Sequence, residues 1–241
     1  YGERGMFGGG YHFPSPQGHV DTIDYVTVAT TGNAVDFGNR TVSMSYIAAA
    51  SSGTRGLFAG GETGSNHIDY ITIATVGNAI DFGDLSSTRE RVTGVSNGIR
   101  GIWGGGYPPQ SINIIEYSVF ATLGNVTDFG DLTIARYDAG ACSNATRGIW
   151  GGGHDPSATS TVMDYITMAT TGNATDFGDL LVANVANAAS SNGTRGVWGG
   201  GQEGSPSVRR IQYVTIATLG NAVAFGDMTH DARLLSAGSG T

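Results

Sequence analysis

Apolar positions along the chain fall in short runs that predict β-strands. Residues 68–75 alternate between apolar and polar types and are rich in Ile and Thr, which is the two-residue period and the composition of a strand. A second type of run starts at Arg-Gly and ends in glycines, as in residues 100–106. Both types recur along the whole sequence, which indicates an all-β repeat protein.

The Arg-Gly pairs define the repeat length. They begin at Arg4, Arg55, Arg100, Arg147 and Arg195. Their spacings are 51, 45, 47 and 48 residues, and the interval from the last pair round to the first is 50 when the chain is joined end to end. Five copies of one unit therefore account for residues 1–241, and we predict a single domain over that range.

Each copy carries three further features. A strand with a Tyr follows the glycines, then comes Gly-Asn, then a strand with a Phe, and the Tyr-to-Phe separation is 12 residues in every copy. The pairs are Tyr25 and Phe37, Tyr70 and Phe82, Tyr117 and Phe129, Tyr165 and Phe177, and Tyr213 and Phe225. Gly and Asn both tolerate positive φ, so we expect a hairpin turn at each Gly-Asn. The third feature is a segment of small residues, such as residues 48–50.

Four strands per copy make one blade, so the sequence predicts a five-bladed β-propeller with four antiparallel strands per blade. We label the strands A (small residues), B (Arg-Gly to glycines), C (Tyr) and D (Phe), and expect strand A to line the narrow axis. No segment of type A precedes the first copy. We therefore expect residues 232–241 to pair with residues 2–8, complete the first blade and close the ring.

Loop length varies mainly between strands B and C. The interval from the last B-strand glycine to the Tyr is 15, 9, 11, 12 and 12 residues, whereas the Phe-to-Arg interval is 18 in all four internal cases. Variable loops on a rigid scaffold commonly carry recognition, and polar groups beside exposed rings suit a glycan or a protein. The candidate binding residues are Tyr11, His12, Phe13, His19, Glu62, His67, Tyr107, Gln110, His154, Asp155, Gln202, Glu203 and Arg209.

Composition excludes two classes of partner. The net charge is −8, and all 12 basic residues are Arg. An acidic chain with scattered Arg lacks the basic patch that binds nucleic acid or an anionic membrane surface. No apolar run reaches the ~18 residues of a membrane span. We expect no nucleic-acid partner and no membrane insertion.

The residue types typical of a catalytic site do not cluster anywhere in the sequence. The acidic residues recur evenly, and His12, His19, His67 and His154 lie in three different loops. We find no clustered nucleophile and base and no metal-ligand set, so we expect no enzymatic activity, no catalytic residue, no metal and no cofactor. A polysaccharide-acting hydrolase or lyase is the enzymatic alternative. The Asp-Phe-Gly-Asp run at residues 81–84 recurs in the copies, which favours a structural role in a turn or an Arg contact.

The repeated Arg and Trp residues also have structural interpretations. We expect the Arg of each Arg-Gly pair to bond carbonyls or Asp side chains of neighbouring strands, with a five-fold anion site on the axis as the alternative. Trp103, Trp150 and Trp198, with Phe7 and Phe58 in their place, are expected to pack between blades in preference to serving as sugar platforms.

These repeats resemble the kelch family. The shared features are an apolar strand ending in glycines, a Tyr on the next strand and an aromatic residue on the one after, with Arg91, Arg136 and Arg233 before strand A. More specifically, the Arg-Gly-Ile-Trp-Gly-Gly-Gly and Thr-Gly-Asn-Ala-x-Asp-Phe-Gly-Asp modules are similar to repeats in virion proteins of tailed bacteriophages, especially marine ones. Galactose oxidase is an enzyme with this fold type, but no motif for its Tyr–Cys crosslink surrounds Cys142.

The resemblance implies a tail, fibre or capsid-decorating role on a virion or another extracellular surface. Two non-enzymatic hypotheses follow. The first is a recognition module that binds a glycan or protein receptor through the B–C loops. The second is a purely architectural domain that packs against neighbouring virion subunits.

Overall fold

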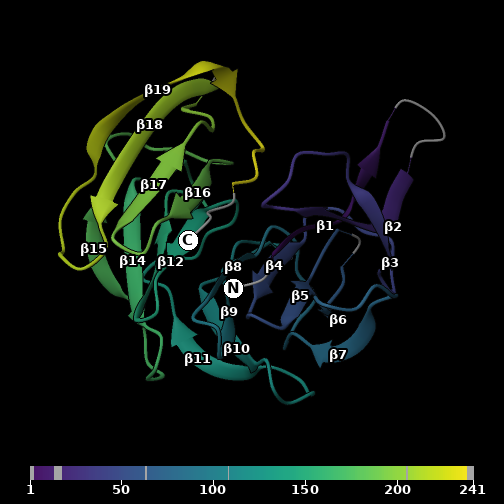
Figure 1. Cartoon of the computed structure of the whole chain (residues 1–241). Helices are drawn as coiled ribbons and strands as arrows, with labels where there is room; N and C mark the ends of the chain where they lie inside the picture. The colour runs from purple at the N-terminus through teal and green to yellow at the C-terminus, as the bar shows by residue number, and fades with distance from the viewer. Residues whose placement is uncertain (1–2, 14–17, 63, 108, 205, 238–241) are drawn as a thin grey trace.

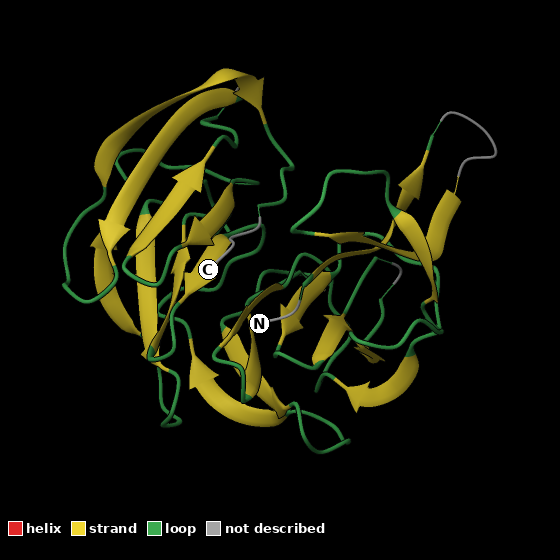
Figure 2. Cartoon of the chain, in the orientation of Figure 1, coloured by secondary structure: helices red, strands yellow, loops and turns green. Residues whose placement is uncertain are grey.

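The chain forms a five-bladed β-propeller. The computed structural model describes residues 3–13, 18–62, 64–107, 109–204 and 206–237. These residues contain no helix, and hence none that could span a membrane, and they form five antiparallel sheets arranged around a central channel (Figures 1 and 2). The predicted fold class is confirmed.

Four of the sheets contain all four predicted strand types in the order A, B, C, D. The first sheet holds β1 (Arg4–His12), β2 (Gly18–Thr27) and β3 (Val35–Asn39). The second holds β4 (Ala48–Ser51), β5 (Arg55–Ala59), β6 (His67–Thr72) and β7 (Ile80–Asp84), and the third holds β8 (Thr93–Ser96), β9 (Arg100–Gly104), β10 (Ile114–Val119) and β11 (Thr127–Asp131). The fourth holds β12 (Gly140–Ser143), β13 (Arg147–Gly151), β14 (Val162–Thr167) and β15 (Thr175–Asp179), and the fifth holds β16 (Ala188–Ser191), β17 (Arg195–Gly199), β18 (Val208–Thr215) and β19 (Val223–Ala232).

Four of the five aromatic residues of strand B pack between neighbouring blades as predicted, and the exception is Phe7, which is exposed. Trp103, Trp150 and Trp198 are fully buried. The Trp150 ring lies against Gly104 of the preceding blade, where an added Cβ would come within 2.8 Å of the indole. Real Cβ atoms do not approach so closely, so glycine at this position is required for the sheets to meet.

One contact within each blade explains why Tyr and Phe are separated by 12 residues in all five copies. In all five blades the two rings meet edge to face, with centroids 5.8–6.0 Å apart. The Arg that opens strand B lies over the same Tyr, for example Arg100 at 4.4 Å from the Tyr117 centroid. Arg100 also donates to the carbonyl of Met168 in the next blade. The prediction that these Arg residues bond neighbouring carbonyls is confirmed for Arg4, Arg55, Arg100 and Arg147.

The Gly-Asn pairs lie in the hairpin connections between strands C and D, as predicted, but they do not form the turn itself. The turn after strand C comes earlier, where the Thr75 amide donates to the Thr72 carbonyl. The Gly-Asn segment then crosses to the preceding blade: Gly77 N–H donates to the Phe37 carbonyl, and Asn78 Oδ1 accepts from the Asn39 amide. Contact between blades therefore determines this conformation more than the local preference of Gly and Asn for positive φ.

Asp of the Asp-Phe-Gly runs has the structural role that was predicted. Its side chain accepts a hydrogen bond from the amide two residues later, as in Asp81 Oδ1 with Gly83. The same bond forms at Asp36 and Asp176. Gly83 in turn lies directly against the Gly124 carbonyl of the next blade, which leaves no room for a Cβ.

Buried ion pairs fix the D–A connections of three blades. Arg40 pairs with Asp69, Arg89 with Glu116 and Arg136 with Asp164. Burial lowers the pKa of all three Arg side chains, and the facing carboxylates oppose this effect for Arg40 and Arg89. In the fifth blade the corresponding residues are Asn184 and Gln212, which are neutral and bond Gly200 O and Leu181 N instead.

The pairing also corrects the alignment of the Arg residues before strand A. Arg136 is equivalent to Arg89, because both pair with an acid on strand C. Arg91 lies two positions later in the repeat, and Arg233 one position later. The sequence alone placed Arg91, Arg136 and Arg233 together because it does not show which acid each Arg faces.

The seam between the fifth and first blades differs from the other four. In the described residues the first sheet has three strands, and Phe7 on β1 is 60% exposed, whereas its counterpart Trp150 is fully buried. Ala232 ends the long strand β19 and pairs with Val208. Residues 233–237 form no strand, and the rest of the predicted closing segment, residues 238–241, lies outside the described residues.

Two observations support the predicted closure. The Leu234 amide donates to the Ala186 carbonyl, continuing a series in which Ala186 bonds Asp138, Asp138 bonds Arg91 and Arg91 bonds Tyr46. Ala237 lines the central channel together with strands A of the other four blades. The tail thus reaches the channel in register with the D–A connections of the other blades, and closure by this segment stays a prediction.

The neutral pair of the fifth blade suggests a test of the ion pairs. Arg136→Asn should destabilise the protein by about 3–5 kcal/mol, because it leaves the Asp164 carboxylate buried without a cation. Adding Asp164→Gln should recover at least half of this loss, since the double variant copies Asn184 and Gln212. Urea unfolding of both variants measures the difference. Equal destabilisation of the single and double variants would show that the charge of Asp164 is not the cause.

A second test concerns the tail. Removing residues 234–241 should cost roughly 3 kcal/mol, at about 1 kcal/mol for each strand hydrogen bond lost. In a domain of this size this lowers the melting temperature by about 6–12 °C. A chain of unchanged length with a Gly-Ser sequence over residues 234–241 is the control and should melt like the truncated protein. Full thermal stability in either variant would contradict closure by the tail.

Candidate functional site

The B–C loops and the D–A connections lie at the same end of the ring. In each complete blade the start of strand A pairs with the end of strand B, as in Ala48 with Ala59. The chain therefore enters strand A at the end where it leaves strand B. We call this end of the ring the B–C face.

Aromatic residues gather at the tip of the first hairpin, which projects from the ring (Figure 1). Tyr11 meets Phe13 at 4.6 Å and His19 at 5.2 Å between ring centroids, and Phe13 is 68% exposed. His12 lies beside them at the end of β1. His19 Nε2 is 3.9 Å from Glu62 Oε2, so the B–C loops of the first two blades meet here. We call Tyr11, His12, Phe13 and His19 the hairpin cluster.

A second group forms a row across three blades. Arg91 lies 4.3 Å over the Tyr46 ring and 5.7 Å from the Tyr137 ring. Tyr137 stacks on His154 at 5.2 Å and meets Tyr107 edge to face at 4.9 Å. We call these five residues, together with Asp138, the Tyr–Arg row.

Ion pairs hold this row in place. Arg91 Nη1 donates to Asp138 Oδ2 at 2.7 Å and Arg91 Nε to Glu90 Oε1 at 3.1 Å. Burial raises the pKa of Asp138, and Arg91 offsets part of the rise. Burial alone would lower the pKa of Arg91, but its bonds to Asp138 and Glu90 outweigh that effect and raise it. Arg91 therefore keeps its charge and has little freedom to move.

Backbone bridges join the two B–C loops of this row to the D–A connections. Tyr107 pairs with Glu90, and His154 pairs with Tyr137. Each of these two loops is therefore anchored to the ring by one bridge.

The other predicted residues are engaged mainly within their own blades. His67 lies 3.7 Å from Asp84, Glu203 pairs with Arg210 at 2.8 Å, and Arg209 is near Asp227 at 3.9 Å. Asp155 accepts hydrogen bonds from the Ser157 and Ala158 amides, which lower its pKa. Gln202 bonds the Gly204 carbonyl and accepts from Arg233, and Gln110 is exposed. Six of the thirteen candidate residues thus fall into two groups, four in the hairpin cluster and two in the Tyr–Arg row, and the candidates of the fifth blade join neither.

Four members of the row were not among the predicted residues. Tyr46, Arg91, Tyr137 and Asp138 lie on D–A connections, whose constant length argued against a role in recognition. The available signal was composition: positions 46, 91, 138, 186 and 234 are equivalent, yet they carry Tyr, Arg, Asp, Ala and Leu. All five have φ between 52° and 57°, a left-handed conformation that costs a non-glycine residue about 1–2 kcal/mol.

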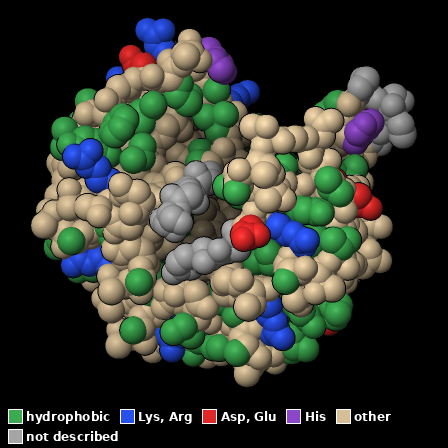
Figure 3. All heavy atoms as spheres, viewed as in Figure 1, with side chains coloured by type: hydrophobic (Ala, Val, Ile, Leu, Met, Phe, Trp, Pro, Cys, Tyr) green, Lys and Arg blue, Asp and Glu red, His purple; other side chains and the backbone are tan. Residues whose placement is uncertain are grey.

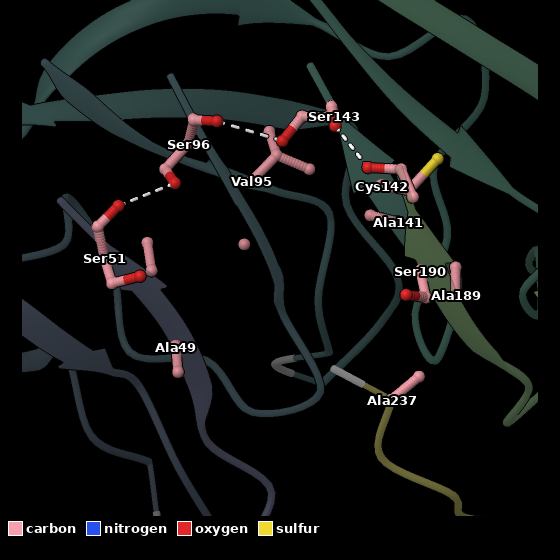
Figure 4. A pocket seen from close by; sticks show the side chains of 13 residues that line it. Ala49, Ser51, Val95, Ser96, Ala141, Cys142, Ser143, Ala189, Ser190 and Ala237 are labelled. Atoms are coloured by element: carbon pink, nitrogen blue, oxygen red, sulfur yellow. Dashed lines mark hydrogen bonds between the residues drawn. The ribbon is translucent and has the colours of Figure 1, made fainter. Parts of the chain in front are cut away.

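Strand A lines the central channel, as predicted. The walls consist of Ala, Gly, Val, Ser and Cys residues (Figure 4). Hydroxyls connect neighbouring blades: Ser96 donates to the Ser51 carbonyl and Ser143 to the Ser96 carbonyl, at 2.8 and 2.9 Å. These serines use their donors within the wall.

Charged side chains do not form a basic patch on the face seen in Figure 3, where the arginines are spread singly around the ring. Among the residues that the structure describes, no group of three or more His, Cys, Asp or Glu side chains is placed to hold a metal ion. No protein-family model matches the chain, and no curated protein matches it in sequence.

Cys142 provides a test of the packing behind the channel wall. Its thiol is buried next to Gly196 of the fifth blade, and burial raises its pKa to about 12. Because the thiolate is the reactive form, we expect almost no reaction with a disulfide reagent at pH 8 in the folded protein. Complete reaction in guanidinium chloride is the control. Rapid reaction without denaturant would show that the wall beside the fifth blade opens.

Proposed function

We propose that this propeller is a non-enzymatic recognition module that binds a glycan or a protein receptor through its B–C face. The observation that carries the proposal is that exposed aromatic side chains lie on this face in fixed positions, at the hairpin cluster and the Tyr–Arg row. Rings that are already immobilised lose little conformational entropy on binding. The resemblance to kelch repeats and to phage virion repeats supports display on a virion or another extracellular surface.

A second candidate function is architectural packing against a neighbouring virion subunit. Its support lies at the opposite end of the ring, at the turns between strands C and D. Val76, Leu123 and Leu219 precede Gly-Asn in three copies and are 52–56% exposed. Exposed apolar residues in repeated positions suit a flat contact with another protein.

Binding by surface variants separates the two functions. We expect the protein to bind at least one target on a glycan array or on a panel of bacterial cell surfaces. Combining Tyr11→Ala with Tyr107→Ala should weaken that binding at least tenfold. Leu123→Ser, at the opposite end, is the matched control and should leave it unchanged.

Absence of binding by folded protein in both assays would contradict the recognition function. Binding that is lost in Leu123→Ser and retained in the Tyr variants would favour the architectural surface.

A further inference from the structure

We propose that the Tyr–Arg row is a binding site for a neutral sugar residue. The proposal rests on the recognition function above and assigns a ligand class to one part of the B–C face. It is carried by the shape, the chemistry and the charge of the row.

The shape is concave. Three of the six row residues, Tyr46, Arg91 and Asp138, line a cavity of about 990 Å³ that extends from the mouth of the central channel to the unpaired edge of β1. Tyr107, Tyr137 and His154 are not part of its lining. The predicted closing strand would occupy the part along β1, and Arg91 and Asp138 lie on the side of the third and fourth blades. Concave spaces suit small ligand groups, whereas protein partners usually meet larger and flatter surfaces.

The side chains supply both kinds of contact that a sugar needs. Arg91 covers one face of the Tyr46 ring, but Tyr46 and Tyr107 are still 38% and 39% exposed. The exposed part of each ring offers an apolar surface against which the C–H face of a pyranose can pack. The Asp138 carboxylate and the Arg91 guanidinium offer acceptors and donors for neighbouring hydroxyls. Because Arg91 is held by Glu90 and Asp138, these groups keep their positions before a ligand arrives.

The charge around the row disfavours acidic sugars. Glu90, Asp138 and Asp155 bring three carboxylates to the row, against the guanidinium of Arg91 and that of the buried Arg136, which interacts with Asp155 but is already paired with Asp164. The Arg91 guanidinium already bonds two of the carboxylates, and the whole chain carries −8. A uronic or sialic acid would meet an excess of negative charge, whereas a neutral hexose would not.

The row occupies one side of the channel mouth. At the same repeat position the remaining copies carry Ala186 and Leu234, which have no hydrogen-bonding side chain. The sugar is therefore expected beside the second, third and fourth blades.

Ligand-observed NMR with the full chain tests the site. The neutral probes are the methyl glycosides of glucose, galactose, mannose and N-acetylglucosamine, and the acidic probes are glucuronic acid and N-acetylneuraminic acid. At least one neutral probe should bind, at least tenfold more tightly than either acidic probe. Tyr46→Ala should weaken its binding at least fivefold, Tyr46→Phe should keep it within twofold, and Asp138→Asn should weaken it at least threefold.

Leu123→Ser, at the opposite end of the ring, is the matched control and should bind as the unchanged protein does, and Tyr11→Ala is measured beside it. Thermal melting of each variant verifies that it is folded, and the Phe variant retains the ring if the Ala variant does not fold. If the B–C face binds a protein receptor but no neutral probe, the sugar site is overturned and the recognition function stands. If Tyr11→Ala abolishes probe binding and Tyr46→Ala does not, the row is likewise overturned. If neither saccharides nor cell surfaces bind, both proposals fail.

Discussion

Contact between an aromatic ring on one blade and a glycine on the blade before it holds the ring of sheets together. Trp150 lies on Gly104, Trp198 on Gly151 and Phe58 on Gly8, each at a distance that excludes a Cβ. The glycine is needed because the aromatic side chain is large, and the aromatic side chain is buried because the glycine leaves room for it. This mutual requirement explains the glycine at positions 8, 104 and 151, whereas the second blade carries Ala59 at the equivalent position.

Polar contacts between the D–A connections and strands C supplement this packing. The residues that form them vary more from blade to blade. Three blades use a buried Arg with an acid, and one uses Asn with Gln. In the second blade Arg40 stands where the third and fourth blades have Leu85 and Leu132, and Met44 stands where they have Arg89 and Arg136. The cation and the apolar side chain have exchanged positions four residues apart, and the cation still reaches the acid on strand C. The repeat therefore preserves the interaction more strictly than the position that supplies it.

Local patterns were sufficient to predict the number of sheets, the four strand types and the inner position of strand A. Alternation, glycine runs and spacing are properties of short segments. The Gly-Asn turns were misplaced because Gly77 and Asn78 bond the preceding blade, and a contact between blades leaves no local signal. The Tyr–Arg row was missed for the same reason: Tyr46, Arg91 and Tyr137 come from different copies and meet only when the ring has formed.

At the channel mouth, the residues with a left-handed backbone conformation allow the side chains presented there to change without a change in the backbone geometry of the blades. Their amides and carbonyls link Tyr46, Arg91, Asp138, Ala186 and Leu234 in series, so the backbone geometry of each blade is set by main-chain atoms. The side chain at each point contributes little to that geometry, and five chemically different residues occupy it. Substitution there can alter what the mouth presents while the scaffold keeps its dimensions. A protein built in this way can acquire new specificities one residue at a time, without first gaining stability elsewhere.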